Sequence, residues 1–353
     1  MRQVTKIDFS GQTIFAGIDV HKKSWKVSIR SEHMELRTFS QEPSADILSR
    51  HLRNNYPGAD YRVVYEAGFC GFSIQRTFSG EGISCLVVNP ADVPSTDKEH
   101  QRKSDGVDCR KLSRTLSEGS LRGIYIPDVE QQDDRAVIRA YHQLVKDQTR
   151  YKNRIKSWLC FQGIDIPVEH TGWSNNFTLW LKEMELTPSA RISLDLLLEG
   201  YTHARQLVAD AARQVRALSA QLRHKETIRL LRSVPGIGQI AALLFAVEIG
   251  HIGRFRRLDQ LCDFVGLVPR IHNSGERQTT LGLTHRAHYK LRETLIEVSW
   301  VAVRLDPAMT LYFGQSAKRM VKNKAIIKVA RKMLNRIRFV MTSRQEYVNA
   351  VVR

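Results

Sequence analysis

Short apolar runs alternate with amphipathic stretches over the first 119 residues. Alternation and continuous apolar runs predict five strands, over residues 14–20, 25–30, 34–40, 61–66 and 83–90. Helical spacing predicts three helices, over residues 44–56, 72–82 and 103–119, the first with Ser44 as its N-cap. The order β-β-β-α-β-α-β-α is typical of the α/β fold of ribonuclease H and RuvC-like proteins.

Two heptad patterns occupy the middle of the chain, each about three heptads long. The first runs through Val137, Tyr141, Leu144, Gln148, Tyr151, Ile155 and Trp158. The second runs through Leu197, Tyr201, Ala204, Val208, Ala211, Val215, Leu218 and Leu222. They predict either an antiparallel helical hairpin packed on itself or a dimerising coiled coil. Self-association is favoured, because two apolar heptad faces of this length can serve both in packing the hairpin and in joining two protomers. A short helix is expected between them in WSNNFTLWL.

The last third is predicted to be all-α. Two helical stretches flank Val-Pro-Gly-Ile-Gly at 234–238, which predicts a helix-hairpin-helix element; the plainer alternative is an αα-hairpin with a glycine turn. Gly236 and Gly238 permit a tight turn and a close approach to phosphate. Residues 316–340 carry nine Lys and Arg and no acid. Apolar residues at 326, 329, 333 and 337 make this stretch an amphipathic helix.

The charge balance indicates a polyanionic partner. The chain has 54 Lys and Arg against 36 Asp and Glu, a net charge of +18 over 353 residues. Nucleic acid fits this excess better than a membrane surface. No apolar run approaches the ~20 residues that span a bilayer, and residues 1–12 have no signal-peptide core. Five scattered cysteines without a CxxC pair argue against disulfides or structural zinc, so a cytoplasmic protein is expected.

Four acids are candidates for phosphoryl-transfer chemistry. Asp19 ends the first strand and Glu66 ends the fourth, its neighbour in this topology. Asp105 and Asp108 are three residues apart, so they share one face of a helix. Carboxylates converging at one sheet edge repel one another unless divalent cations bind, which predicts one or two Mg²⁺ ions. Taken singly, each acid is more often a turn residue or a complement to a helix dipole.

Sugar kinases and actin-like ATPases also open with a strand–Gly–Ile–Asp hairpin. They need a second ATPase lobe with its own acidic hairpin, and the sequence shows none. The kinase interpretation is therefore the weaker one.

Ser274 is a candidate nucleophile for attack on phosphate. It lies in a polar segment, Asn273-Ser274-Gly275, surrounded by cations that would stabilise charge on phosphoryl oxygens. Ser-Gly in a loop is usually only a turn. His272, His285 and His288 are nearby, and none is placed as an obvious base. The predicted nucleic-acid-binding residues are Pro235, Gly236, Gly238, Arg254, Arg256, Arg257, Arg270, Arg277, Arg286, Lys290, Lys322, Lys324, Lys328, Arg331 and Lys332.

Together these blocks resemble the DEDD-type insertion-sequence transposases of the IS "one-ten" family, the bridge-RNA-guided serine recombinases. GIDVHKKSWKVSI, YEAGFCGF, VVNPADVPSTDKE, KSDGVDCRKLSR, YKNRIKSWLCFQGIDIP, VPGIG and FVGLVPR–NSGE stand in family order over nearly the whole chain. The resemblance implies that Asp19, Glu66, Asp105 and Asp108 are the Mg²⁺-binding tetrad. It also implies that Ser274 attacks DNA and forms a phosphoserine link.

The resemblance further implies a composite site, in which the tetrad of one protomer faces the serine of another. It implies double-stranded donor and target DNA, a structured noncoding guide RNA, a homo-oligomer and a location at the bacterial or archaeal nucleoid. One departure stands out: Ala287-His288 occupies the place where the family often has Gly-Asn.

The sequence thus predicts a RuvC-like domain over 1–128, a helical coiled-coil region over 129–226 and a serine transposase domain over 227–353. The predicted activity is excision and insertion of a mobile element. A metal-dependent nuclease or junction resolvase without a serine nucleophile is the alternative, and a non-catalytic nucleic-acid binder is a third possibility.

Overall fold

A computed structural model describes residues 8–94, 105–170, 172–274 and 277–349; the side chains of Asp105 and of residues 271–281 lie outside that description. The chain divides into two compact units, Met1–Ile126 and Pro127–Arg353. The division between these units follows residue 126, and the domain boundary expected after residue 128 stays a prediction. The second expected boundary, after residue 226, falls inside the second unit and stays a prediction.

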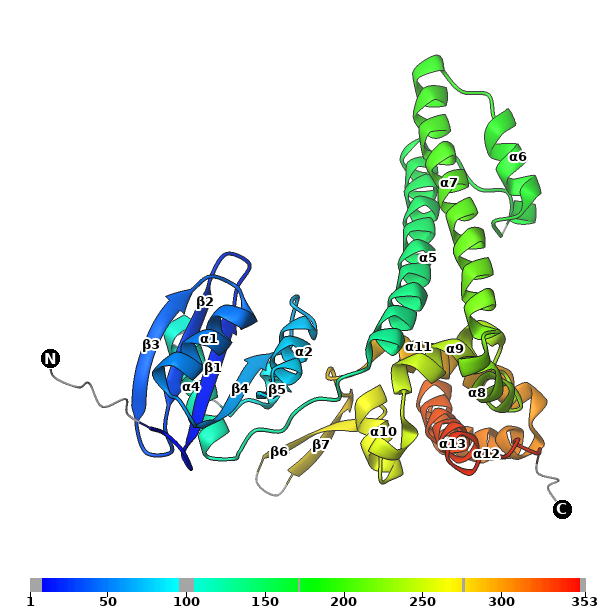
Figure 1. Cartoon of the computed structure of the whole chain (residues 1–353). Coiled ribbons are helices and arrows are strands. Elements are labelled where there is room, and N and C mark those ends of the chain that lie inside the picture. The colour runs from blue at the N-terminus through cyan, green and yellow to red at the C-terminus, as the bar shows by residue number, and fades with distance from the viewer. Residues whose placement is uncertain (1–7, 95–104, 171, 275–276, 350–353) are drawn as a thin grey trace, which may run out of the picture. The chain divides into compact units, whose positions relative to one another are not determined.

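The N-terminal unit is built on a five-stranded sheet of order β3-β2-β1-β4-β5 (Figure 1). The strands are β1 (Thr13–Val20), β2 (Trp25–Arg30), β3 (Glu35–Gln41), β4 (Asp60–Glu66) and β5 (Ser84–Val88). The first three are antiparallel, and β1, β4 and β5 are parallel. The helices are α1 (Ala45–Asn55), α2 (Ser73–Gly80) and α4 (Asp105–Ser117), with a 3-10 turn at Pro90–Asp92. This topology fits a ribonuclease H-like domain, as the order of elements predicted.

The two faces of this sheet carry different cores. Under α1 and α2, alternate strand residues such as Ile18 and Tyr65 pack with Leu48 and Phe78. On the other face, Val64 and Val88 pack with Leu112 of α4. Ser44 caps α1 as predicted, because its side chain accepts a hydrogen bond from the Ile47 amide.

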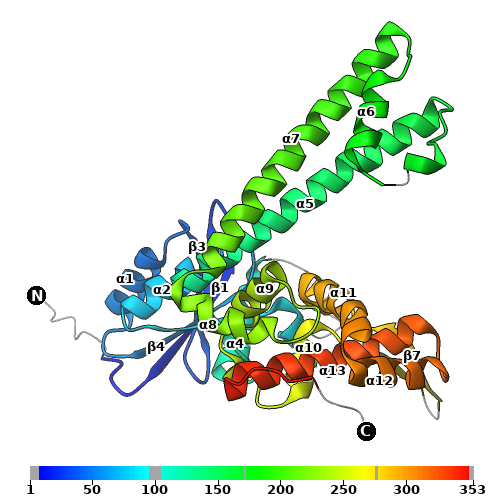
Figure 2. The same cartoon turned by 90° about the vertical axis from the view of Figure 1, so that its right-hand side faces the viewer.

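The second unit begins with a helical hairpin. Helices α5 (Val129–Phe161) and α7 (Pro188–Ser219) run antiparallel, side by side, in both views (Figures 1 and 2). Between them lie a 3-10 turn, Val168–His170, and the expected short helix α6 (Asn175–Glu183). Phe177 and Leu181 of α6 pack with Ile155, Leu159 and Leu198. The hairpin therefore has a core of its own at its far end.

The heptad prediction is wrong at two positions. Val137 is 39% exposed, whereas its neighbour Ile138 is fully buried. The reason is that the first turns of α5 pack on α9 and α8 as well as on α7, which rotates the buried face. Leu222 is 91% exposed, because α7 ends at Ser219 and Leu222 begins the next helix.

The remaining helices are α8 (Leu222–Arg232), α9 (Gln239–Ile249), α10 (Leu258–Val265), α11 (Tyr289–Leu305), α12 (Pro307–Ala317) and α13 (Lys322–Ser343). They surround one apolar core, with a 3-10 turn at Ile252–Arg254. The apolar face predicted for α13 is confirmed: Ile326, Val329, Met333 and Ile337 are at most 3% exposed.

The expectation of an all-α C-terminal region is wrong. Strands β6 (Pro269–Ser274) and β7 (Arg277–Leu283) pair as an antiparallel hairpin. The polar composition of this stretch indicates a loop, but the β-branched residues Thr279 and Thr280 favour a strand. Within the described ranges, every helix is too short or too polar to cross a membrane.

Candidate active site

Two adjacent parallel strands bring the first two predicted acids to one edge of the sheet. In the β1–β4 ladder Ile18 pairs with Tyr65. Asp19 and Glu66 are the next residues, so they stand side by side at the carboxyl ends of their strands. Ile18 and Tyr65 are both buried in the core under α1 and α2. Since side chains alternate along a strand, the carboxylates of Asp19 and Glu66 belong to the opposite face, which α4 covers.

Helix α4 approaches that face at Gly17. A Cβ atom at Gly17 would lie 2.3 Å from the carbonyl oxygen of Cys109, so glycine is required for this close packing. Helix α4 begins at Asp105, and Asp108 immediately precedes Cys109. The first turn of α4, which carries both remaining acids, therefore lies near the same edge as Asp19.

Asp19 has basic neighbours. His21 Nε2 lies 3.1 Å from Asp19 Oδ2, whose side chain is 21% exposed. Lys26 pairs with Asp19 across the β1–β2 ladder, and its Nζ donates to Ser40 Oγ at 3.2 Å. Burial and the charge of Asp19 raise the pKa of the Cys109 thiol to about 11. The field of the Asp19 carboxylate thus reaches the first turns of α4.

The donor chemistry of this edge suits a hard divalent cation. Mg²⁺ prefers carboxylate oxygens, and it is usually held by one or two carboxylates together with substrate phosphates. In the part of the chain that the structure describes, no three His, Cys, Asp or Glu side chains are grouped so as to hold a metal ion. Asp19 and Glu66 supply carboxylate oxygens at the carboxyl edge of the sheet. Such a set fits a metal whose coordination the substrate completes.

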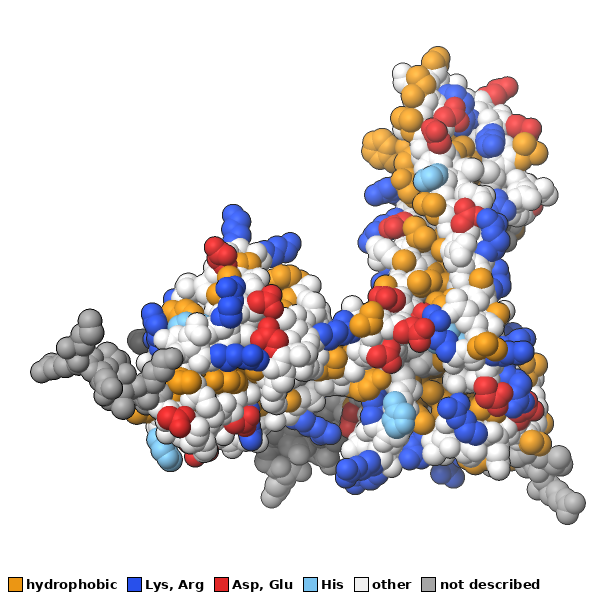
Figure 3. Space-filling view, viewed as in Figure 1, with side chains coloured by type: hydrophobic (Ala, Val, Ile, Leu, Met, Phe, Trp, Pro, Cys, Tyr) orange, Lys and Arg blue, Asp and Glu red, His pale blue; other side chains and the backbone are white. Residues whose placement is uncertain are grey.

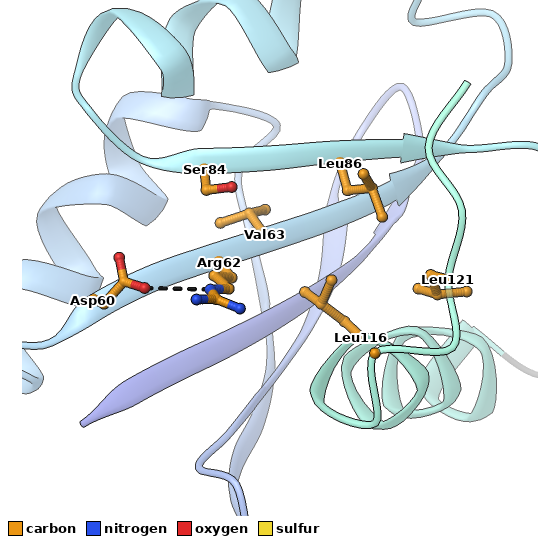
Figure 4. A pocket seen from close by; sticks show the side chains of 8 residues that line it. Asp60, Arg62, Val63, Ser84, Leu86, Leu116 and Leu121 are labelled. Carbon is orange, nitrogen blue, oxygen red and sulfur yellow. Dashed lines mark hydrogen bonds and ion pairs between the residues drawn. The ribbon is translucent and has the colours of Figure 1, made fainter. Parts of the chain in front are cut away.

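A separate cavity of about 370 Å³ lies at the other end of the same strands (Figure 4). It is lined by Asp60 and Ser84, the first residues of β4 and β5, and by Arg62. Asp60 and Arg62 form an exposed ion pair at 3.2 Å. Because Asp19 and Glu66 lie at the carboxyl ends of β1 and β4, this cavity is not part of the candidate active site.

Ser274 is the last residue of β6, where the ladder pairs it with Arg277 of β7. The backbone of the serine therefore stands at the tip of a two-stranded hairpin, in register with a predicted phosphate-binding residue. Gly275, the third residue of the predicted loop, lies outside the described residues.

The base of this hairpin is held by Arg292 of α11. Its Nη1 donates to the carbonyl oxygens of Gly266 at 3.2 Å and Thr284 at 2.9 Å. The Thr284 amide also donates to the Val268 carbonyl at 3.1 Å. Gly266 has a φ of 83°, and a Cβ atom there would lie 2.2 Å from the Cβ of Ala287. These contacts join the segment before β6 to the segment after β7.

His288 caps α11 and contacts a buried glutamate. Its Nδ1 accepts a hydrogen bond from the Leu291 amide at 3.2 Å. Its Nε2 lies 3.2 Å from Glu248 Oε2. With Nδ1 accepting, the ring proton is on Nε2 and is donated to Glu248. Both ring nitrogens are thus occupied within the fold, which favours a structural role for His288 over general-base catalysis.

Glu248 is the centre of a charged network that joins α5, α9 and α11. It is 2% exposed, and Arg139 donates to its two oxygens at 2.7 and 2.8 Å. Arg135 lies 3.6 Å from Oε2 and donates to the Val247 carbonyl at 2.7 Å. Burial raises the pKa of Glu248, but hydrogen bonds from His288 and Arg139 outweigh it and lower the pKa to about 2. The network fixes the start of α11, and with it the residues that follow the Ser274 hairpin.

Most of the predicted nucleic-acid-binding side chains lie on the surface, and Lys and Arg are spread over the C-terminal helices in Figure 3. The exposed ones are Arg256, Arg257, Arg270, Arg286, Lys322, Lys324, Lys328 and Lys332. Arg331 pairs with Asp259, and Lys290 pairs with Glu293 at 3.3 Å. The side chain of Arg277 lies outside the description.

Arg254 is bound within the protein. Its guanidinium lies 4.3 Å from the ring centroid of Phe255 and 4.6 Å from that of Phe264. It also donates to the Ile249 carbonyl at 3.0 Å, at the end of α9. These contacts favour a structural role for Arg254 over phosphate binding.

The predicted helix-hairpin-helix turn divides into a packed part and an open part. Pro235 is half-buried, and Gly236, with a φ of 86°, faces α11: a Cβ there would lie 2.6 Å from the Val298 carbonyl oxygen. Gly238 is exposed at the N-terminus of α9, with open space around it. The α9 end, at Gly238, is the part of the turn that phosphate can approach.

Residue type and spacing do not predict the contacts of Lys26, Glu248 and Arg292, although Arg292 belongs to the basic stretch around Ser274. Lys26 is predicted on a strand, but its pairing with Asp19 depends on the β1–β2 register. Glu248 closes the apolar run AALLFAVE. An acid at that position, within an otherwise buried helix, is the signal that can identify it.

Comparison with known proteins agrees with the geometry. A model of IS110-type DEDD transposases, described as "Transposase", matches residues 16–161, and "Transposase IS116/IS110/IS902 family" matches residues 228–314. The transposase for insertion sequence element IS1111A of Coxiella burnetii is 29% identical, over 81% of this chain and 79% of its own. Putative transposase y4rJ of Sinorhizobium fredii is 27% identical, over 96% and 92%. The chain therefore carries transposase domains of the IS110/IS116/IS902 family, and transposases are enzymes that cleave and rejoin DNA.

Proposed function

We propose that this transposase moves its element by a serine-nucleophile mechanism assisted by metal ions at the Asp19–Glu66 edge. The observation that carries the proposal is the β1–β4 register. It sets Asp19 and Glu66 side by side on the face where α4 begins with Asp105 and Asp108. Mg²⁺ bound there would neutralise charge on the scissile phosphate and on the leaving oxygen.

The carboxylates of the chain act as ligands and as orienting groups. Asp19 is held by His21 at 3.1 Å, and Lys26 stands opposite in the ladder. The ammonium group of Lys26 limits repulsion between the acids before substrate phosphates enter. Asp108, at the first turn of a helix fixed by the Gly17 contact, completes the edge.

Ser274 is the proposed nucleophile. Its Oγ loses its proton and forms a bond to phosphorus while the bond from phosphorus to one DNA oxygen breaks, and that oxygen takes up a proton and leaves as a hydroxyl. The phosphodiester is kept as a phosphoserine, so a second strand can reverse the step without an external energy source. The tip of the β6–β7 hairpin gives the serine backbone a fixed register with Arg277, and Arg292 fixes the base.

Recognition of the two DNAs is proposed to use a structured guide RNA and a homo-oligomer joined by the α5–α7 hairpin. Exposed apolar side chains support self-association: Ile192 is 63% and Leu196 65% exposed, one turn apart on α7. Hydrophobic surface is visible on this hairpin in Figure 3. The charge of +18 supports binding of more than one nucleic acid.

The test is made in cells that carry the gene in its native flanking DNA. The circular junction of the excised element is amplified for wild type, Ser274→Ala and Asp108→Asn, with Asp92→Asn, an acid of the Pro90–Asp92 turn, as the control. We expect product in wild type and control and at least a ~100-fold loss in both other variants. Wild-type product levels in Ser274→Ala would instead support a metal-dependent nuclease.

A further inference from the structure

The loop that follows Glu66 presents an aromatic ring to solvent. Phe69 is 64% exposed, although it lies in the short connection between β4 and α2. Ala67, Cys70 and Phe72 of the same loop pack against the core under α1 and α2. The loop thus packs its other apolar side chains against the core and leaves Phe69 outside, where apolar surface stays in contact with water.

The loop that carries Phe69 is fixed at both ends. The Ala67 amide donates to the Val88 carbonyl at 2.7 Å, and the Gly71 amide to the Gly68 carbonyl at 3.2 Å. The buried Tyr65 hydroxyl donates to the Gly71 carbonyl at 2.9 Å. Gly71 has a φ of 59°, which glycine adopts without strain. The ring is therefore displayed by an ordered turn.

The surroundings of Phe69 are cationic and adjoin the acidic edge. Phe69 is three residues after Glu66, at the carboxyl end of β4. Lys22 Nζ lies 5.9 Å from its ring centroid, in the β1–β2 turn. That turn also presents exposed His21 and Lys23. An exposed ring beside lysines and next to carboxylates has the components of a single-stranded nucleic-acid site.

We propose that Phe69 stacks on an unpaired base of the DNA strand whose phosphate enters the Asp19–Glu66 edge, with Lys22 contacting a neighbouring phosphate. This inference rests on the proposed function of that edge. Stacking on an aromatic side chain is tolerant of base identity, because every base has a π-face. The proposed ligand is therefore an unstacked nucleotide of any sequence, and Phe69 sets the position of the strand.

Photocrosslinking tests the contact directly. Full-length protein is irradiated with an oligothymidylate that carries 5-iodouracil, and crosslinked peptides are sequenced by mass spectrometry. We expect a crosslink at residue 69 in wild type and in Phe69→Tyr, which keeps the ring. Crosslinks that map only to other residues would overturn the proposal.

Binding measurements separate stacking from charge. Affinity is measured for oligothymidylate and for an abasic oligomer of the same length. We expect Phe69→Ala to weaken binding of the first about 5- to 100-fold and to leave the second unchanged. Met34→Ala is the control, because Met34 is 61% exposed in the β2–β3 turn, at the opposite end of the sheet. Equal losses for both oligomers, or no loss for either, would contradict stacking.

The two proposals fail differently. In one outcome, Asp108→Asn abolishes the excision junction, whereas Phe69→Ala keeps the junction and binds oligothymidylate as wild type does. The proposal for the acidic edge then stands, and the proposal for the stacking site is wrong. If Phe69→Ala loses the junction and Phe69→Tyr restores it, both proposals are supported.

Discussion

Glu248 shows how single residues tie the hairpin of Ser274 to the rest of its unit. The carboxylate is 2% exposed and is hydrogen-bonded by Arg139 and His288. Removing one partner of a buried ion pair leaves the other charge uncompensated. We expect Glu248→Gln to lower the free energy of unfolding by about 3 kcal/mol, measured by urea denaturation at neutral pH. Glu226→Gln is the control, since Glu226 pairs with Arg229 on the surface of α8, and no change of midpoint is expected.

The same group gives stability a definite pH dependence. The pKa of Glu248 is lowered from 4.5 in a free side chain to about 2 in the fold. A lowered pKa stabilises the folded state above pH ~4.5, and this contribution is lost as pH falls toward 2. The difference in free energy of unfolding between wild type and Glu248→Gln should therefore become smaller below pH 4.5. A gap that stays constant down to pH 2.5 would show that the lost stability does not come from the ionised carboxylate.

For single residues, the positions of Asp19 and Glu66 at the ends of predicted strands are enough to place them at one edge of the sheet, because the topology determines which strand ends are adjacent. It does not distinguish Arg254, which lies on two phenylalanine rings, from Arg256, which is exposed. Both are arginines in one basic cluster, and their roles depend on packing that residue type alone does not encode.

At the scale of elements, the contact of α4 with β1 controls where two of the four acids stand. A methyl group at Gly17 would lie 2.3 Å from the Cys109 carbonyl and 2.5 Å from the Ser113 amide, so α4 must move. We expect Gly17→Ala to cost about 1–3 kcal/mol of stability, by thermal melting, and to reduce excision at least tenfold.

Gly80→Ala is the matched control, because Gly80 lies in helix α2 with open space where the methyl group would go. It should be neutral or slightly stabilising. Full excision activity in Gly17→Ala would show that the placement of α4 does not matter for the reaction.

The sequence pattern predicted the elements of the first unit well, because its central strands are short apolar runs buried on both faces and helices such as α1 bury one face. Apolar periodicity failed where one helix packs against different helices along its length. The first turns of α5 bury Asp134 and Arg135 against α8 and α9, which an apolar heptad search does not detect. It also failed at β6 and β7, whose strands carry few apolar residues and were therefore expected to form a loop.

At the scale of the whole molecule, excess positive charge should appear as salt-dependent DNA binding. Lys324 and Lys328 are exposed one turn apart on α13, whose other face is buried. We expect the double change to glutamine to reduce the slope of log affinity against log salt by about 2, since each phosphate contact contributes about 0.9.

Arg254→Gln is the control for the double lysine variant. Because its guanidinium is held by Phe255, Phe264 and the Ile249 carbonyl, this change should lower the melting temperature and leave the salt slope unchanged. A reduced slope in Arg254→Gln, or an unchanged slope in the double lysine variant, would mean that phosphate contacts lie elsewhere.

The most direct test of the central claim is capture of the covalent intermediate. Purified protein, with Mg²⁺ and the nucleic acids that flank the element, is incubated with end-labelled DNA and resolved under denaturing conditions. A protein–DNA adduct that maps to the peptide of Ser274, and that is absent in Ser274→Ala and in Asp108→Asn, is the predicted result. DNA cleavage without an adduct, or an adduct that persists in Ser274→Ala, would contradict the serine mechanism.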